Sequence, residues 1–320
     1  MGESRQNPEQ LLKSLQTDEE NRNKGHLKIF FGYAAGVGKT YAMLEAAHMA
    51  KQQGIDVVAG YVEPHACPKT AALLNGLEVL PTREVFYNGM ILDEFDIGMA
   101  LKRKPQLILV DELAHTNAEG CRHAKRYQDI KELLNAGIDV YTTVNVQHIE
   151  SLCDTVASIT EIVVRERIPD SIFDNADQVE LIDIEPQDLI NRLNTGNVYR
   201  QTQAKQAVEN FFTIENLTAL REISLRRCAD RVNILTENTR IKNHGDYHTG
   251  EHILVCLSSS PSNAKIIRTA AKMASAFKGE FTALFVETPD FSVMSEENVK
   301  RLRSNIRLAE QLGAKIETVY

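Results

Sequence analysis

The sequence predicts an α/β protein in which short buried strands alternate with amphipathic helices. Apolar runs rich in Val, Ile and Phe occupy residues 27–33, 56–62, 107–112, 139–145 and 178–184. Each run is nearly all apolar without alternation, which is typical of strands buried on both faces of a parallel sheet. Helical patterns lie between several of them, at 39–53, 91–103 and 124–136. This order predicts a layered sheet with ligands at the carboxyl ends of its strands.

The rest of the chain divides into a helical segment, a linker and a second α/β unit. Residues 186–232 carry leucines and alanines at helical spacing, and the polar stretch that follows holds two glycines. Strand and helix patterns then alternate at 252–258, 262–277, 280–288, 296–312 and 315–320. We therefore expect a polar N-terminal segment, a sheet domain with a helical appendage, a linker and a second domain, at 1–24, 25–235, 236–250 and 251–320.

Composition excludes several classes of protein. The chain has 320 residues, 43% of them hydrophobic, and no apolar run approaches the roughly 20 residues of a membrane helix. Its N-terminus is polar, without the apolar core of a signal peptide, so we expect a cytoplasmic protein. The net charge is −8 and the basic residues are dispersed, which argues against nucleic acid as a partner.

The segment GVGKT, residues 36–40, has the chemistry of a phosphate-binding loop. Its glycines allow the backbone to approach a phosphate, its lysine can reach the terminal phosphates, and its threonine hydroxyl can ligate Mg²⁺. A predicted strand precedes the loop and a helix follows, and a helix N-terminus attracts anions. The alternative is a glycine-rich turn with a surface lysine. The predicted nucleotide ligands are Gly36, Val37, Gly38, Lys39 and Thr40.

The start of this loop departs from the usual pattern. A glycine is expected four residues before the Gly-Lys-Thr, at position 33, but Tyr33 stands there and Gly32 comes one residue early. We therefore expect an unusual turn at the start of the loop, with its phosphate-binding end intact.

Acidic residues end a buried strand downstream, in LILVDE. Asp111 is expected to hold Mg²⁺, as an aspartate does in P-loop enzymes. Glu112 can position or deprotonate an attacking water, although a solvated acid at a strand end is the alternative. His148 is a weaker catalytic candidate, and a structural histidine that caps a helix is its alternative. The loop and Asp111 together predict a P-loop NTPase-like sheet that binds Mg-ATP.

Further polar residues follow two of the predicted strands. Glu63 and His65 end the second strand. A basic loop after Asp111 can clamp a phosphate or an acidic partner, and a solvated face is the equal alternative. Its residues are His115, Arg122, His123, Lys125 and Arg126.

These motifs resemble the N-terminal sensor region of the KdpD family, the osmosensing histidine kinases that control high-affinity potassium uptake. The resemblance rests on FFGYAAGVGKTYAML, GYVEPH, DELAHTN and TTVNVQHIESL, and it covers nearly the whole chain. In that family the loop likewise begins with a glycine one residue early. The resemblance implies a regulatory ATP-binding module of a two-component system. The implied partners are a histidine kinase core, in the same longer chain or separate, and its response regulator.

The second α/β unit resembles the first part of a universal-stress-protein (USP) domain, a small doubly wound nucleotide-binding fold. The glycine-rich loop that closes the ATP site of that family does not occur in this sequence. We therefore expect a partial USP-like domain, either truncated or completed by a partner.

A further resemblance concerns a second ligand. Some KdpD proteins of Gram-positive bacteria bind cyclic di-AMP through Ser-x-Ser followed, twenty residues later, by Phe-Thr-Ala-x-Tyr. Here the final tyrosine is a phenylalanine, whose ring can still stack on a base. An ordinary strand with apolar residues facing a core is the alternative. The matching residues are Ser258, Ser260, Phe281, Thr282, Ala283 and Phe285.

The sequence contains no membrane helices, phosphoacceptor-histidine domain or catalytic kinase domain, so we do not expect it to autophosphorylate alone. Our first hypothesis is a signalling module that binds Mg-ATP and, in its second domain, cyclic di-AMP. The second is a stand-alone P-loop ATPase or small-molecule kinase, and weak ATPase activity is compatible with both. The third is an adaptor for a separate kinase. A larger membrane-bound kinase would bring the module to the membrane.

Overall fold

The computed structural model describes residues 24–63, 68–87, 89–194, 211–244, 251–277, 279–287 and 294–319. The chain divides into two compact units. The first consists of residues 1–144 and 176–201, and the second of residues 145–175 and 202–320. The second unit thus takes in residues 145–175, which the sequence placed within a continuous domain at 25–235. The polar N-terminal segment, apart from Lys24, and His65 lie outside the described residues.

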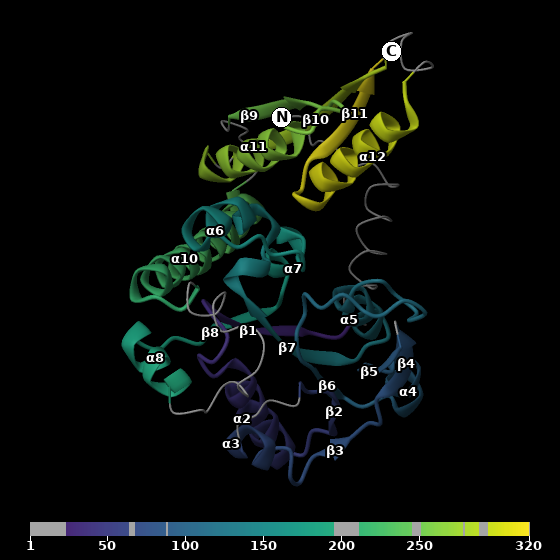
Figure 1. The fold of residues 1–320 in the computed structure, drawn as a ribbon, viewed down its shortest axis with the longest axis vertical. Coiled ribbons are helices and arrows are strands. Elements are labelled where there is room, and N and C mark those ends of the chain that lie inside the picture. Colours follow the sequence, from purple (N-terminus) through teal and green to yellow (C-terminus); the bar gives the residue numbers. More distant parts are fainter. Residues whose placement is uncertain are drawn as a thin grey trace, which may run out of the picture. The chain divides into compact units, whose positions relative to one another are not determined.

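The first unit is built on a six-stranded sheet with the strand order β3-β2-β6-β7-β1-β8 (Figure 1). The pairs β1–β8, β2–β3, β2–β6 and β6–β7 are parallel, which confirms the predicted α/β class with a mostly parallel sheet. All five predicted strands occur in this sheet. The strands are β1 (Leu27–Gly32), β2 (Val57–Tyr61), β3 (Glu78–Val79), β6 (Leu107–Val110), β7 (Asp139–Asn145) and β8 (Gln178–Leu181).

Helices pack on the sheet through small and apolar residues. The alanine-rich helix α2 (Lys39–Gln52) buries Met43 and Leu44 against Phe30 and Leu109 of the sheet. Because strand side chains alternate between faces, the neighbouring strand residues face the other way. The remaining helices of this unit are α3 (Pro68–Ala72), α4 (Ile97–Arg103), α5 (Arg126–Asn135) and α8 (Pro186–Asn194).

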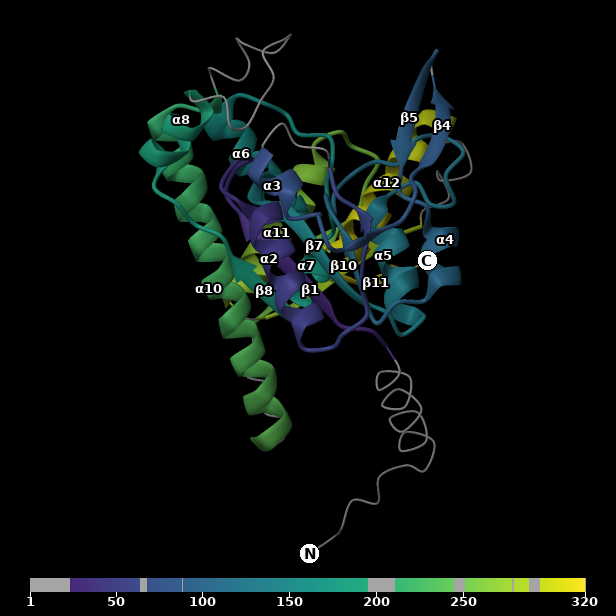
Figure 2. The same cartoon turned by 90° about the horizontal axis from the view of Figure 1, so that it is seen from below.

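One predicted helix is wrong in its first turn. Residues 91–94 belong to β5 (Met90–Glu94), which pairs antiparallel with β4 (Arg83–Tyr87) in a hairpin, and α4 begins only at Ile97. The hairpin is visible as a narrow two-stranded projection in Figure 2. The sequence does not reveal this hairpin, because its apolar residues are not buried. Phe86 and Ile91, for example, form a cross-strand pair that is largely exposed.

The direction of the chain connections reverses at the neighbouring strands β1 and β7. The connection after β1 leads to β2, toward one edge of the sheet, whereas the connection after β7 leads to β8 at the other edge. In open α/β sheets such a reversal leaves a crevice at the carboxyl ends of the strands, where ligands bind. The predicted phosphate loop follows β1, and Asp111 follows β6, the other neighbour of β7.

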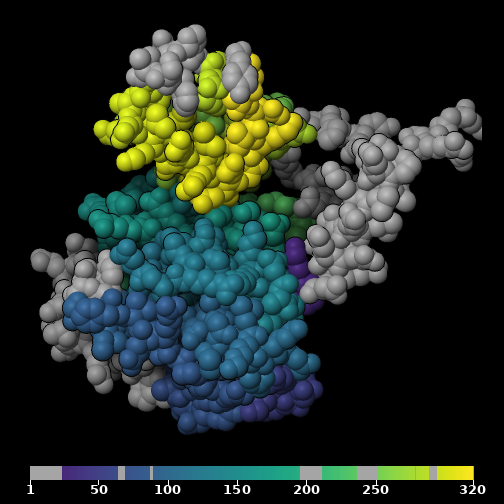
Figure 3. Space-filling view, turned by 90° about the vertical axis from the view of Figure 1, so that its right-hand side faces the viewer, coloured from purple at the N-terminus to yellow at the C-terminus, as the bar shows by residue number. Residues whose placement is uncertain are grey.

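The second unit contains a three-stranded parallel sheet with the order β11-β10-β9. Its elements confirm the predicted alternation of strands and helices. Because the strands are added in one direction, right-handed connections place both helices on the same face, as Figure 1 shows. In Figure 3 the coloured residues of this sheet and its helices, green to yellow, lie together. The elements are β9 (His252–Cys256), α11 (Asn263–Phe277), β10 (Glu280–Val286), α12 (Glu296–Gln311) and β11 (Lys315–Val319).

Residues 145–175 and the long helix α10 (Ile214–His244) complete the second unit. Buried Arg227 of α10 binds Asp174 at 2.6 Å and its guanidinium lies over the ring of Phe173. The helix continues to His244, so it extends into the stretch predicted as a linker from residue 236. The short helices are η1 (Val146–His148), η2 (Glu150–Leu152), α6 (Cys153–Thr160) and α7 (Asp170–Asp174). Among the described residues, no helix has the length and apolar character needed to cross a bilayer.

A buried ionic cluster joins residues 145–175 to α11. Glu150 accepts hydrogen bonds from Arg268 at 2.8 and 3.1 Å and from Arg167 at 3.3 Å. Lys272, one turn further along α11, donates to the Thr155 hydroxyl at 2.9 Å. Since Glu150 is 7% exposed, its carboxylate relies on these donors in place of water.

We expect Glu150→Gln to lower the free energy of unfolding by about 2 kcal/mol, because two guanidinium groups lose a shared anion in a buried setting. Urea unfolding measures the change. The matched control is Glu222→Gln, which breaks an exposed pair with Arg226 on α10 and should cost less than about 0.5 kcal/mol. Equal losses in the two variants would contradict a special role for Glu150.

Candidate nucleotide-binding site

The predicted phosphate loop joins β1 to α2, and two of its glycines adopt backbone angles that other residues avoid. Gly36 has a φ of 89° and Gly38 a φ of 111°, both in the left-handed region. Gly38 directly precedes α2, and because glycine has no side chain, it cannot cap the first N–H groups of the helix. The first N–H groups of a helix lack partners within the helix, and together with the helix dipole they stabilise an anion.

Gly32 comes one residue early because loop side chains pass directly over it. A methyl group at residue 32 would lie 2.7 Å from Cγ2 of Val37 and 3.2 Å from Cδ of Lys39, so a larger residue would displace both. Tyr33 is fully buried, and its hydroxyl donates to the Ile184 carbonyl at 3.0 Å. The shifted glycine therefore permits a close contact, and the tyrosine fixes the loop to the segment after β8.

Lys39 has an unusual environment for an ammonium group. It is 8% exposed, and in the described part of the chain its Nζ makes one hydrogen bond, to the Ala34 carbonyl at 3.0 Å. An ammonium has three donors. Burial lowers the pKa of Lys39 to about 8, although the negative charges of Asp111 and Glu112 oppose the shift. An anion at this position would stabilise the charged form.

Asp111 draws three segments of the first unit together. It is fully buried, and its Oδ2 accepts from the hydroxyl of Thr40, at the start of α2, at 3.1 Å. Its Oδ1 accepts from the hydroxyl of Thr143 on β7 and from the Glu112 N–H. Hydroxyl and carboxylate oxygens are the ligands that Mg²⁺ prefers. Thr40 and Asp111 therefore have the right chemistry for the predicted metal.

Glu112 has a constrained backbone and a perturbed carboxyl. Its φ of 59° is in the left-handed region, which is uncommon for a residue with a side chain. The residue keeps an exposed face, yet its surroundings raise the pKa of the carboxyl to about 7. The largest cause is loss of hydration, followed by repulsion from Asp111 and Glu63. A carboxyl that titrates near neutral pH can take a proton from water.

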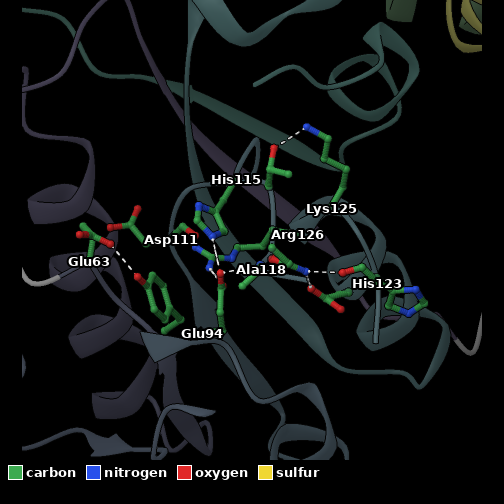
Figure 4. A network of polar contacts seen from close by, with 12 residues as sticks. Glu63, Glu94, Asp111, His115, Ala118, His123, Lys125 and Arg126 are labelled. Carbon is green, nitrogen blue, oxygen red and sulfur yellow. Dashed lines mark hydrogen bonds and ion pairs between the residues drawn. The ribbon is translucent and has the colours of Figure 1, made fainter. Parts of the chain in front are cut away.

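Glu94, the last residue of β5, is the centre of a buried polar cluster beside this site (Figure 4). Its carboxylate accepts from the Ala118 N–H at 2.8 Å, from Arg126 Nη2 at 3.0 Å and from His115 Nε2 at 3.1 Å. Burial acts to raise the pKa of Glu94, but the hydrogen bonds and the positive charges of its partners hold it below the usual value.

Arg126 connects this cluster to Asp111. Its side chain is fully buried, and Nη1 donates to the Asp111 carbonyl at 3.2 Å. The guanidinium carbon lies 4.1 Å from the centroid of the Tyr61 ring, a cation–π contact. Tyr61 in turn donates to Glu63 at 2.7 Å. The cluster therefore holds the main chain at Asp111, in addition to the contacts that hold its carboxylate.

The other charged side chains of the predicted basic loop also bond to groups of this protein. Arg122 and His123 both pair with Glu132, at 2.5 and 2.8 Å, and Lys125 donates to Thr116 at 2.6 Å. Arg122 remains exposed, which fits the alternative of a solvated face for this residue. These contacts order the loop that carries the Glu94 partners.

The structure places all the predicted nucleotide-loop residues, Asp111 and Glu112 in the first unit and His148 in the second. Val37, within the loop, is buried. His148 belongs to the second unit, where its Nδ1 donates to the Glu166 carbonyl at 2.8 Å. This contact favours the alternative of a structural histidine.

The residues predicted to bind a second ligand occupy two kinds of position. Ser258 and Ser260 lie exposed in the turn after β9, and Arg301 of α12 donates to the carbonyl of the serine between them at 3.3 Å. Phe281 and Ala283 are buried in the core, which the alternative of an ordinary strand predicted. Of the two remaining residues, Thr282 is hydrogen-bonded to His252 at 2.8 Å, and Phe285 is half-buried near the end of β10.

Sequence reasoning missed Glu94, Thr143 and the buried role of Arg126. The partners of Glu94 are 21 to 32 positions away along the chain, so no local spacing reveals them. Thr143 gave a usable signal, because it is one of two neighbouring threonines buried in a strand, and it lies just beyond the paired residues Leu109 and Tyr141.

Comparison with known proteins places the chain in a family. The family model described as "KdpD: Osmosensitive K+ channel His kinase sensor domain" matches residues 23–232, which include the loop, Asp111 and the Glu94 cluster. The chain belongs to the KdpD sensor family. This confirms the resemblance read from GVGKT and DELAHTN.

Relatives in the KdpD family match nearly the whole chain. "Sensor protein KdpD" of Clostridium acetobutylicum is 54% identical over 99% of this chain, and that of Escherichia coli is 49% identical over 98%. The chain spans 35% of the length of each. The "Putative sensor protein KdpD" of Synechocystis is 47% identical over 82% of this chain, and the match spans 70% of that relative.

The raised pKa of Glu112 predicts a pH-dependent stability. The folded protein holds this proton more tightly than the unfolded chain does, so the stability contributed by the group falls as the pH rises from 4.5 to about 7. Glu112→Gln removes the titration, so the variant should gain stability relative to the wild type over this range. Urea unfolding at about pH 5 and about pH 8 measures the difference.

The control is Glu119→Gln, which removes one exposed carboxyl from the same loop. If both variants show the same change with pH, the effect belongs to net charge and not to the Glu112 environment.

Proposed function

We propose that this chain is the nucleotide-sensing part of a KdpD-type histidine kinase in a two-component system for potassium regulation. In this proposal the first unit is a P-loop NTPase-like domain that binds Mg-ATP as a signal. The second contains a USP-like domain that takes a second ligand, cyclic di-AMP. The kinase core and its response regulator are the partners that receive the output.

The observation that carries the ATP proposal is the buried ammonium of Lys39. A lysine with a lowered pKa, one described hydrogen bond and a position at a helix N-terminus is costly to the isolated protein. A bound phosphate would supply the negative charge and the acceptors that this group lacks. The left-handed glycines beside it let backbone N–H groups approach the same phosphate.

Magnesium fits the same proposal. The Thr40 hydroxyl and the Asp111 carboxylate are 3.1 Å apart, and the carboxylate also accepts from the Thr143 hydroxyl and the Glu112 N–H. When bound, the metal would neutralise charge on the phosphates. Thr40 and Asp111 are the residues that would hold it, directly or through water.

Glu112 supports a second candidate function, a P-loop ATPase or small-molecule kinase. Its carboxyl has a pKa of about 7 and follows the proposed metal ligand directly, so it can orient a water or accept its proton. His148 is weaker in this role because it is already bonded to a carbonyl in the other unit. Slow hydrolysis that depends on Glu112 is compatible with a signalling role, in which the rate of hydrolysis would set how long ATP stays bound.

Support for cyclic di-AMP comes from the turn after β9. The exposed hydroxyls of Ser258 and Ser260 precede the N-terminus of α11, where a phosphate is stabilised. Phe285, near the end of the adjacent strand, is half-buried and would contribute ring surface for stacking on a base. Because Phe281 and Ala283 are core residues, they would support the site without contacting the ligand.

Lys39→Ala should weaken ATP binding at least about tenfold, because it removes the charge-assisted contacts of the loop. Titration of labelled ATP with Mg²⁺ measures the affinity. Lys102→Ala, which removes an exposed lysine from α4 in the same unit, is the control and should bind like the wild type. Equal affinity of the wild type and Lys39→Ala would refute the phosphate loop.

The same preparations separate the two candidate functions. Phosphate release that disappears in Glu112→Gln while ATP binding survives would establish an ATPase. No release from the wild type, with binding intact, would leave the nucleotide as a signal.

For the second ligand, we expect wild-type protein to bind cyclic di-AMP in calorimetry and Ser260→Asp to lose that binding, because the new carboxylate repels the phosphates. Ser304→Asp places the same charge on the exposed face of α12 and serves as the control. Phe285→Tyr, which restores the motif, should bind at least as tightly as the wild type. Absence of binding by both wild type and Phe285→Tyr would end the cyclic di-AMP proposal.

A further inference from the structure

An arginine from a distant part of the chain lies at the phosphate loop. A methyl group built on Gly38 would lie 3.9 Å from Nη1 of Arg192 and 4.0 Å from Cγ2 of Ile182. Arg192 belongs to α8, the helix that follows β8 along the chain. Sequence reasoning treated this segment only as a helical appendage and assigned it no ligand.

Two hydrogen bonds hold the segment that leads into α8, and one buried side chain anchors the helix itself. The Ile182 N–H donates to the Phe31 carbonyl at 2.7 Å, which extends the pairing of β8 with β1. Tyr33, at the start of the loop, donates to the Ile184 carbonyl. Within α8, Leu189 is fully buried. Since residues three apart share a face of a helix, Arg192 stands on the same side as Leu189.

The chemistry of Arg192 complements that of Lys39. Lys39 is buried and acts as a point charge, whereas Arg192 is exposed and carries a planar group with several N–H donors. A guanidinium beside Gly38 is next to the backbone that a phosphate would contact. Two oxygens of one phosphate can accept from a guanidinium at the same time.

We infer that Arg192 is a phosphate-binding residue that completes the nucleotide site from α8. The ligand class is a nucleoside di- or triphosphate, and the guanidinium contacts phosphate oxygens held beside Gly38. This inference rests on the proposed nucleotide site and adds a second cation to it. Its consequence is that a bound nucleotide joins the loop after β1 to the helix after β8, two segments about 150 residues apart.

The test is titration of Mg-ATP and Mg-ADP against the full chain with Arg192→Ala, Arg192→Lys and Arg192→Gln. Arg192→Ala and Arg192→Gln should each weaken nucleotide binding by roughly tenfold to a hundredfold, the range for hydrogen bonds to charged groups. Arg192→Lys should lose less affinity, because lysine keeps the positive charge and loses only the ability to bond two phosphate oxygens at once. Arg303→Ala, an exposed arginine on α12, is the matched control.

The outcomes separate this inference from the proposed function. If the wild type binds ATP, Lys39→Ala does not, and all Arg192 variants bind like Arg303→Ala, the inference is wrong while the nucleotide site stands. If the wild type itself fails to bind, both are wrong. Unfolding of each variant without nucleotide shows that the fold is kept. Loss of affinity in Arg192→Gln with unchanged unfolding supports the contact, since a purely structural role would lower stability as well.

Discussion

The hydrogen bonds that converge on the buried carboxylate of Asp111 are the constraint on which the rest of the site depends. They join the start of α2, the end of β6 and the middle of β7, so loop, metal ligand and sheet have one fixed geometry. A carboxylate without exposure needs all of these donors, because each one replaces a water. The structure thus holds the proposed metal ligand in position before any ligand arrives.

The Glu94 cluster supports Asp111 a second time, through the main chain of this residue. Arg126 carries one hydrogen bond to Glu94 and another to the Asp111 carbonyl, so the hairpin strand β5 and the site share a single buried guanidinium. Stacking on Tyr61 restricts the same side chain further. Such a network leaves few alternative positions for the peptide before Glu112, and this is consistent with its left-handed backbone.

Much of this architecture could be predicted from local patterns, and the remainder depends on distant contacts. Five of the six strands of the central sheet were predictable from their apolar runs. The short strand β3 was not, because both of its residues are exposed. The β4–β5 hairpin was not, because Phe86 and Ile91 are exposed and the following residues have helical spacing. GVGKT and Asp111 were recognisable because they match a known sequence motif. Glu94 and Arg192 come close to these residues only through tertiary contacts, which no sequence motif records. Gly32 is explained only by the side chains that cross it.

Helix α10 has a mechanical consequence for the second unit. Its 31 residues span about 46 Å at the rise of an α-helix. Arg227 and Arg231 fasten it to the segment around Phe173. His244 lies 13 residues beyond Arg231, about 20 Å along the helix axis, so a tilt of a few degrees at this attachment would move it by about 1 to 2 Å. A small rearrangement near Phe173 would therefore be passed along the whole helix.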